Sequence, residues 1–174
     1  MNIRSTIVRI LSMLVFCFAF NRAEAVDTSE LIRASMIEKI VRFIEWPPWT
    51  HEQFTLCVID KTPLLSAIQT YYENSSINDK PVNVFIVNNM TEFNGCQAIY
   101  LDEEQTNDLA DILKIIRNQP ILIVAEEKNA VLLGAHLGFF IEDNRLRLEV
   151  NRKALTNSGF KVSYHLLKES RIVD

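Results

Sequence analysis

The side chains best suited to catalysis or metal binding are few and scattered in this sequence. It has three histidines, His51, His136 and His165, and three cysteines. A protein zinc site needs several such ligands at short, regular spacing, and none of the histidines has a second ligand at that spacing. The pattern favours structural or surface roles for the histidines and predicts no metal site.

Acidic side chains occur in two short runs that have the right chemistry for a divalent cation. Asp102, Glu103 and Glu104 form the first run, and Glu126 and Glu127 form the second. The alternative is a helix start for the first run, where carboxylates favour the positive end of the helix, and a solvated loop for the second. We favour this alternative for both runs.

The catalytic and nucleotide-binding motifs with a known geometry are missing. There is no Gly-x-Ser-x-Gly turn of a hydrolase. The residues that follow the first predicted strand, 59–63 (IDKTP), lack the Gly-x-Gly-x-x-Gly pattern, and the whole chain has only four glycines. We therefore expect no catalytic residues, no cofactor and no enzymatic activity.

One cleft still follows from the order of the predicted strands. Open α/β sheets bind ligands beyond the carboxyl ends of their parallel strands. Asp60, Asp102 and Glu126 each follow a predicted strand directly, so they should gather at this edge. They are our candidates for a ligand cleft, and the alternative is a solvated row of loops.

The first 25 residues have the composition of an export signal. Arg4 and Arg9 precede an apolar run at 10–20, which is too short to span a bilayer, and Ala23-Glu24-Ala25 is typical of a signal-peptidase site. An uncleaved anchor is the alternative. We predict a cleaved signal peptide at 1–25, a single domain at 26–174, and a periplasmic location.

Charge and cysteine count then limit the partners of the exported chain. Three arginines and one glutamate lie in the signal, which leaves 15 basic and 21 acidic side chains, a net charge of −6. Such a chain is a poor nucleic-acid binder. Cys17 leaves with the signal, and the remaining Cys57 and Cys96 predict one disulfide, with two buried free thiols as the alternative.

The hydrophobic pattern alternates between strands and helices. Helices are predicted from Thr28 or Ser29 to about Glu45, after Pro63, and around 104–116. Strands are predicted at Phe54–Ile59, 81–87, Ala98–Leu101 and 121–125. This order predicts an α/β fold: a single-domain, mostly parallel sheet with flanking helices, Rossmann-like without a dinucleotide motif, that ends in an antiparallel hairpin.

The predicted hairpin spans residues 137–150. Asp143-Asn144 tolerates the left-handed backbone of a tight turn. Leu146, Leu148 and Val150 alternate with Arg145, Arg147 and Glu149, which predicts one buried and one solvated face. Asn151 should cap a short helix at Arg152–Asn157 that ends before Gly159, and Ser163 should cap a last helix.

Two tryptophans flank the Pro47-Pro48 stop of the first helix. An exposed Trp46 and Trp49 would form a partner-binding hot spot. We favour the alternative, in which Trp46 closes one end of the core.

Several segments, in order, resemble the YfiR-type family of periplasmic regulators. They cover nearly the whole exported chain: 43–47 (FIEWP), 57–59 (CVI), 95–101 (GCQAIYL), 121–124 (ILIV), Gly134, 144–151 (NRLRLEVN), 159–163 (GFKVS) and 166–167 (LL). The resemblance implies a non-enzymatic protein of the Gram-negative periplasm, often a homodimer. Such a protein binds the periplasmic sensor domain of an inner-membrane diguanylate cyclase and holds the cyclase inactive, which lowers cyclic di-GMP and restrains biofilm formation.

The resemblance also implies further partners and residues. An outer-membrane lipoprotein can sequester such regulators, and the family's disulfide carries over to Cys57 and Cys96. The second cysteine pair of some members is missing here. The family's Glu-aliphatic-Asn pattern matches Glu149 and Asn151, which we expect to serve structural integrity or partner contact, together with Arg145, Arg147 and the tryptophans.

A second function remains open from the residues alone. The chain is also consistent with a periplasmic small-molecule sensor that uses the cleft near Asp60 and Asp102 and signals to another membrane receptor, such as a sensor kinase. A periplasmic enzyme is the third alternative, and the missing catalytic constellation argues against it.

Overall fold

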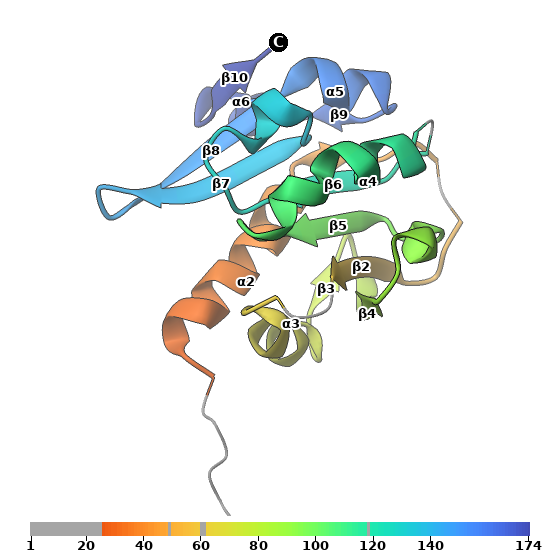
Figure 1. Cartoon of the computed structure of the whole chain (residues 1–174). Coiled ribbons are helices and arrows are strands. Elements are labelled where there is room, and N and C mark those ends of the chain that lie inside the picture. Colours follow the sequence, from red (N-terminus) through yellow and green to blue (C-terminus); the bar gives the residue numbers. More distant parts are fainter. Residues whose placement is uncertain (1–25, 49, 60–61, 118) are drawn as a thin grey trace, which may run out of the picture.

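The computed structural model of the chain describes residues 26–48, 50–59, 62–117 and 119–174 (Figure 1). The predicted signal peptide, Trp49 and Asp60 lie outside the described residues. No helix in the described part of the chain is long and apolar enough to cross a membrane.

An eight-stranded sheet forms the centre of the molecule, with the strand order β10-β8-β7-β6-β5-β2-β4-β3. Its middle strands are parallel: β4 (Lys80–Val87), β2 (Phe54–Ile59), β5 (Ala98–Leu101), β6 (Leu122–Ala125) and β7 (Leu137–Glu142). The strand β8 (Arg145–Asn151) returns antiparallel to β7. The predicted fold class is therefore confirmed.

Helices cover both faces of this sheet (Figure 1). They are α2 (Thr28–Val41), α3 (Leu65–Tyr72), α4 (Leu109–Ile115), α5 (Arg152–Asn157) and α6 (Tyr164–Lys168). Three short 3-10 helices lie in the connections: η1 (Met90–Phe93), η2 (Gln105–Asp108) and η3 (Ala130–Leu133). The η2 turn precedes α4, so the predicted helix after Glu104 begins in 3-10 rather than α geometry.

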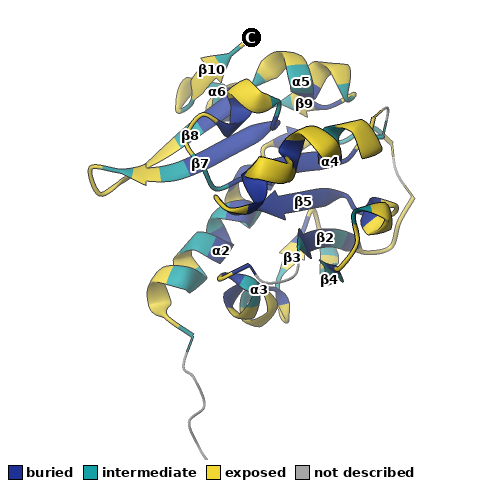
Figure 2. Cartoon of the chain, in the orientation of Figure 1, coloured by how far each residue is buried: buried dark blue, intermediate teal, exposed yellow. Residues whose placement is uncertain are grey.

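The alternation of side chains along the strands divides the core into two layers. Leu56 and Val58 pack with α2 and α3 on one face, while Cys57 between them faces the α4 layer. Every residue of β5 and β6 is buried, because these two strands are covered on both faces (Figure 2). The disulfide between Cys57 and Cys96 lies in the α4 layer, which confirms the predicted pairing.

The first helix is shorter than its hydrophobic periodicity predicts. It ends at Val41, and Ile44–Glu45 forms the short strand β1, which pairs antiparallel with β9 (Lys161–Val162). The buried Ile44 continues the apolar stripe of the helix, so the pattern alone does not show the change. Residues 44–45 form a strand because they pair with β9, which lies more than 100 residues away in the sequence.

Two further short strands were not predicted. The β3 strand (Ser76–Ile77) forms a tight hairpin with β4, and Asn78 and Asp79 have positive φ in its turn. The β10 strand (Arg171–Val173) pairs parallel with β8 and forms one edge of the sheet.

The C-terminal hairpin has the predicted turn but only part of the predicted faces. Asp143 and Asn144 adopt φ of 51° and 55°. Leu146 is 38% exposed because the hairpin tip extends beyond the helices, and Glu149 is only 1% exposed. The prediction of a buried leucine face and a solvated Glu149 is therefore wrong at these two positions. The caps of the following helices are as predicted, since Asn151 accepts from the Ala154 N–H and Ser163 from the His165 N–H.

Candidate functional site

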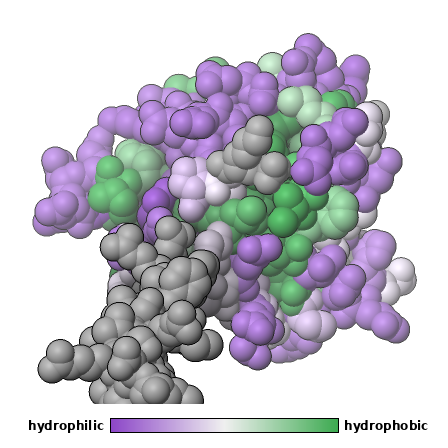
Figure 3. Space-filling view, turned by 60° about the horizontal axis from the view of Figure 1, so that its bottom comes forward, coloured by the Kyte–Doolittle hydropathy of each residue, from purple (hydrophilic) through white to green (hydrophobic). Residues whose placement is uncertain are grey.

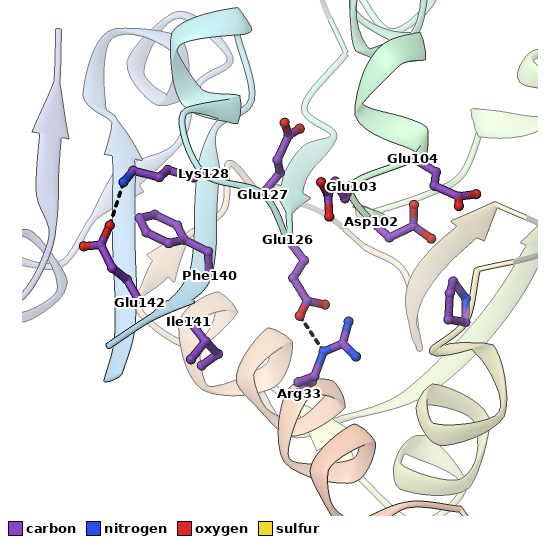
Figure 4. A pocket seen from close by; sticks show the side chains of 11 residues that line it. Arg33, Asp102, Glu103, Glu104, Glu126, Glu127, Lys128, Phe140, Ile141 and Glu142 are labelled. Atoms are coloured by element: carbon purple, nitrogen blue, oxygen red, sulfur yellow. Dashed lines mark hydrogen bonds and ion pairs between the residues drawn. The ribbon is translucent and has the colours of Figure 1, made fainter. Parts of the chain in front are cut away.

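A pocket of about 700 Å³ lies at the carboxyl ends of β5, β6 and β7 (Figure 4). Its lining is rich in carboxylates, with two cations and one aromatic side chain among them. It consists of Arg33, Pro63, Asp102, Glu103, Glu104, Glu126, Glu127, Lys128, Phe140, Ile141 and Glu142. The position is the edge at which parallel sheets bind ligands.

Glu126 connects α2 to the end of the sheet on the floor of this pocket. Its Oε1 accepts a hydrogen bond from Arg33 Nε at 2.5 Å, and its Oε2 accepts one from the Tyr100 hydroxyl at 2.5 Å. Burial, and then the neighbouring Glu126 charge, raise the pKa of Tyr100 well above its usual range, so the phenol stays a donor. The Glu126 carboxylate also raises the pKa of Arg33. Glu126 is thus fully engaged within the protein.

The remaining carboxylates leave an excess of negative charge in the pocket. Asp102 is 6% exposed; its Oδ1 accepts from the Gln105 N–H at 3.0 Å, while its Oδ2 has no hydrogen-bond partner among the described residues. Glu127 Oε2 is also buried, and it too has no hydrogen-bond partner among the described residues. A buried acceptor without a donor is costly, so a cationic ligand would be favoured here.

The opposite wall is formed by the hairpin. Lys128 Nζ pairs with Glu142 at 2.6 Å and lies 5.7 Å from the centre of the Phe140 ring. The hydrogen bond from Lys128, and its charge, lower the pKa of Glu142. This wall therefore combines an ion pair with the apolar surface of Phe140 and Ile141 (Figure 4).

The structure brings two of the three predicted cleft residues together. Asp102 and Glu126 line the same pocket, and Asp60 lies outside the described residues. A ligand role for them stays a prediction. Sequence reasoning missed Arg33, Lys128 and Phe140, because they reach the pocket from a helix, a loop and a strand whose relative positions no local pattern specifies.

A second cluster, which we call the loop clasp, consists of Glu149, Asn151 and Arg171. Glu149 accepts a hydrogen bond from the Asn129 N–H at 2.9 Å and pairs with Arg171. Asn151 donates from Nδ2 to the Val131 carbonyl at 2.9 Å while its Oδ1 caps α5. The clasp thus fixes the segment between β6 and β7, which supplies Glu126, Glu127 and Lys128 to the pocket.

Gly138 makes room for this arrangement. It lies opposite Glu149 in the hairpin, and a Cβ on it would lie 3.5 Å from the Glu127 carbonyl and from Val131. The 126–134 segment therefore packs directly over the hairpin face on which Glu149 lies, which explains why this carboxylate is buried.

The hairpin tip, at the other end of the hairpin from the loop clasp, is exposed. Ile141 pairs with Leu146 across the two strands, and both are exposed, at 61% and 38%. Arg145 and Arg147 flank them on β8 and are also exposed. Figure 3 shows the resulting green apolar area, bordered by purple, on the projection at the left.

Trp46 packs inside the fold. Its ring makes edge-to-face contacts with Phe54 and Phe160, both at 5.5 Å between ring centres. These neighbours come from β2 and from the turn after α5, so Trp46 closes the end of the core. The position of Trp49 is outside the described residues.

The histidines do not form a site. His136 is 2% exposed; its Nδ1 accepts from the Ile123 N–H at 2.9 Å and its Nε2 lies 2.9 Å from the Ser158 hydroxyl. Burial lowers the pKa of His136 to about 4. His51 and His165 are exposed. Within the described ranges, no three His, Cys, Asp or Glu side chains converge as metal ligands.

Comparison with known proteins gives one family and a general fold. The model of the YfiR/HmsC-like family matches residues 30–171. Among solved structures, the chain is similar to an ABC domain from Streptococcus pneumonia, crystallised in complex with L-Trp, with a TM-score of 0.59 and 11% identity. A conserved domain protein from Vibrio cholerae O1 biovar El Tor gives the same TM-score at 10% identity.

These two matches cover 83% of this chain but only 60% of each of the other chains. The chain therefore spans less than two thirds of those proteins. At such identities the similarity concerns the fold alone.

Proposed function

The chain belongs to the YfiR/HmsC-like family of periplasmic, non-catalytic regulators, and from this premise we propose that it inhibits an inner-membrane diguanylate cyclase by binding the cyclase's periplasmic sensor domain. The observation that carries the proposal is the family match, which spans both the loop clasp and the hairpin. A regulator without catalytic groups acts through a difference in its affinity for two states of its target. Each tenfold difference in affinity shifts the equilibrium between the two states by about 1.4 kcal/mol.

We assign the contact with the cyclase to the hairpin tip rather than to the loop clasp. Glu149 and Asn151 bond to the chain itself, which suits a role in integrity. The tip projects from the molecule and combines exposed Ile141 and Leu146 with Arg145 and Arg147. An exposed apolar pair with flanking arginines has the composition of a binding hot spot.

The test is the cellular level of cyclic di-GMP. A strain that lacks the protein should show a rise that the wild-type gene reverses. Leu146→Ser should fail to reverse it, whereas Ile115→Ser on α4 should succeed, since Leu146 and Ile115 are similarly exposed, at 38% and 39%. No rise in the deletion strain would refute inhibition of a cyclase; equal complementation by both variants would refute the contact at the tip.

The same proposal includes partners beyond the cyclase. We propose a homodimer, sequestered by an outer-membrane lipoprotein, in the periplasm after cleavage near Ala25. Support comes from the family and from the disulfide between Cys57 and Cys96, which requires an oxidising compartment. Mass spectrometry of the protein extracted from the periplasm should give Val26 as its first residue.

The acidic pocket favours a second candidate function, a small-molecule sensor that signals to another membrane receptor such as a sensor kinase. The supporting observation is the unpartnered carboxylate oxygens of Asp102 and Glu127, in a pocket that Phe140 also lines. Calorimetry with spermidine as a probe should show binding that Glu127→Gln weakens and Asp111→Asn, on the exposed face of α4, does not. Absence of binding at millimolar spermidine would count against an organic cation as the ligand.

A further inference from the structure

The β4 strand is an edge strand whose outer side is open over most of its length. The short β3 strand covers only its beginning, through the pairs Ile77–Lys80 and Ser76–Pro81. From Val82 to Val87 the strand pairs with β2 on its inner side, and no described strand lies on its outer side. Figure 3 brings this edge of the sheet forward and shows apolar residues gathered there.

The register identifies the β4 backbone groups that face no partner strand among the described residues. In a two-residue hairpin the flanking residues, here Ile77 and Lys80, exchange hydrogen bonds, so Lys80 directs its backbone groups outward. Because the direction alternates along a strand, Val82, Val84 and Ile86 also direct their N–H and C=O groups outward. They form a template for one more strand.

This edge lacks the features that protect natural sheet edges. Proteins block an open edge with charged side chains, proline or a bulge. Here Lys80 and Pro81 lie under β3, and residues 82–87 (VNVFIV) contain neither charge nor proline. Phe85 is 41% exposed on one face of the strand, and Val82 and Val84 are half-buried on the other. An edge of this kind is a ready template for pairing with another strand.

A groove beside the edge offers space for the side chains of an added strand. It measures about 380 Å³ and lies between α3 and β4. Its lining consists of Gln69, Thr70, Tyr72, Glu73, Val82, Asn83 and Val84. The lining therefore combines the aliphatic side chains of Val82 and Val84 with polar side chains.

We propose that a second copy of this chain covers the edge, so that two β4 strands pair antiparallel about a twofold axis at Val84. Val84 then faces Val84 of the second copy, and Val82 faces its Ile86. About six backbone hydrogen bonds form across the axis. A strand without charge is compatible with itself in this arrangement, and aliphatic pairs face each other on the groove side. The two sheets become continuous.

This inference names the interface of the dimer proposed above, and its test does not involve the cyclase. Sedimentation velocity of the protein purified from the periplasm, over 1–100 µM as a working range, measures its mass. We expect a dimer for the wild type and a monomer for Phe85→Lys, which places a cation at the edge. Ile115→Lys, at a similar exposure of 39%, should remain a dimer.

A second variant distinguishes loss of pairing from loss of folding. Val84→Pro removes one outward N–H and leaves the inner residues Asn83 and Phe85 to pair with β2. It should be monomeric, with a circular dichroism spectrum like that of the wild type. A wild type that is monomeric at 100 µM, a dimer that withstands both edge variants, or a monomer that gains mass only with a partner's strand would each overturn the proposal.

Discussion

Glu149 shows how one buried carboxylate organises a loop. It is 1% exposed and has two partners, the Asn129 N–H and Arg171, which lie on either side of it in sequence. A buried charge is tolerated only when it is paired, so each partner is needed to offset the loss of hydration. Glu149, which the alternating pattern placed in solvent, therefore holds the 126–134 segment of the pocket in place.

Replacement of Glu149 should cost more than replacement of Glu142, whose side chain is 40% exposed. Glu149→Gln keeps an acceptor for Asn129 but loses the charge that pairs with Arg171, so we expect the free energy of unfolding to fall by about 1–3 kcal/mol. Glu142→Gln also removes a paired carboxylate, but a solvated one, and should leave stability nearly unchanged. Urea unfolding of both variants measures the difference, and equal costs would show that Glu149 is not held as described.

His136 should make the stability depend on pH. The pKa of His136 falls from 6.5 to about 4 on folding, so the unfolded state binds more protons between these values. The contribution of His136 to the free energy of unfolding is fully present above about pH 6.5 and is lost as the pH falls toward 4. Between pH 7.5 and 4.5 this amounts to about 2–3 kcal/mol.

The comparison of two histidine variants isolates this effect. His136→Asn should be less stable at pH 7.5, because it leaves space beside Phe160, but its stability should decline less steeply with acid. His165→Asn, at an exposed position, should retain the wild-type slope. If all three proteins lost stability in parallel, titration of His136 would not contribute.

At the scale of elements, local sequence patterns predicted those turns, caps and strands that depend only on nearby residues. The Asp143-Asn144 turn, the Asn151 and Ser163 caps and the apolar β6 run follow from backbone preference and burial, and all occur as predicted. The short β1, β3 and β10 strands were missed. Each has only two or three residues, and β1 and β10 exist because of strands 20 or more residues away.

The pocket was predictable only where it follows from strand ends. Asp102 and Glu126 could be placed because the carboxyl ends of parallel strands share an edge. Arg33 could not, because its distance to Glu126 depends on how α2 crosses the sheet, which no local residue pattern encodes. Arg171, the third residue of the loop clasp, was missed for the same reason, since it comes from β10, the strand nearest the C-terminus.

The disulfide links β2 to the turn before β5, two elements that already pair. Its removal should therefore weaken the fold without changing it. A Cys57→Ala/Cys96→Ala double variant should lose about 2–4 kcal/mol, because the unfolded chain regains the freedom of a loop closed across a separation of 39 residues. Urea unfolding under oxidising conditions measures this loss.

Reductant provides the control for that experiment. It should lower the stability of the wild type once both thiols are shown to be free, and it should leave the double variant unchanged. Equal stability of the two oxidised proteins would contradict a stabilising role of the bond.

At the scale of the whole molecule, the two ends of the domain are joined. The β1 strand pairs with β9, the Ser163 N–H donates to the Phe43 carbonyl at 2.9 Å, and Trp46 packs on Phe160. The segment after α2 therefore lies against the segment after α5. Because core contacts cross the whole chain in this way, neither end should unfold before the other.

Trp46 offers a direct probe of this cooperativity, because the chain has only one other tryptophan. In a Trp49→Phe background, the fluorescence of Trp46 reports the junction of the two ends, and far-ultraviolet circular dichroism reports all helices and strands. We expect both signals to give the same urea midpoint. The Trp46→Phe/Trp49→Phe protein should lose the tryptophan fluorescence change, which confirms its origin. A fluorescence midpoint at lower urea than the dichroism midpoint would show that the ends separate while the sheet persists, and the fold would then consist of two units rather than one.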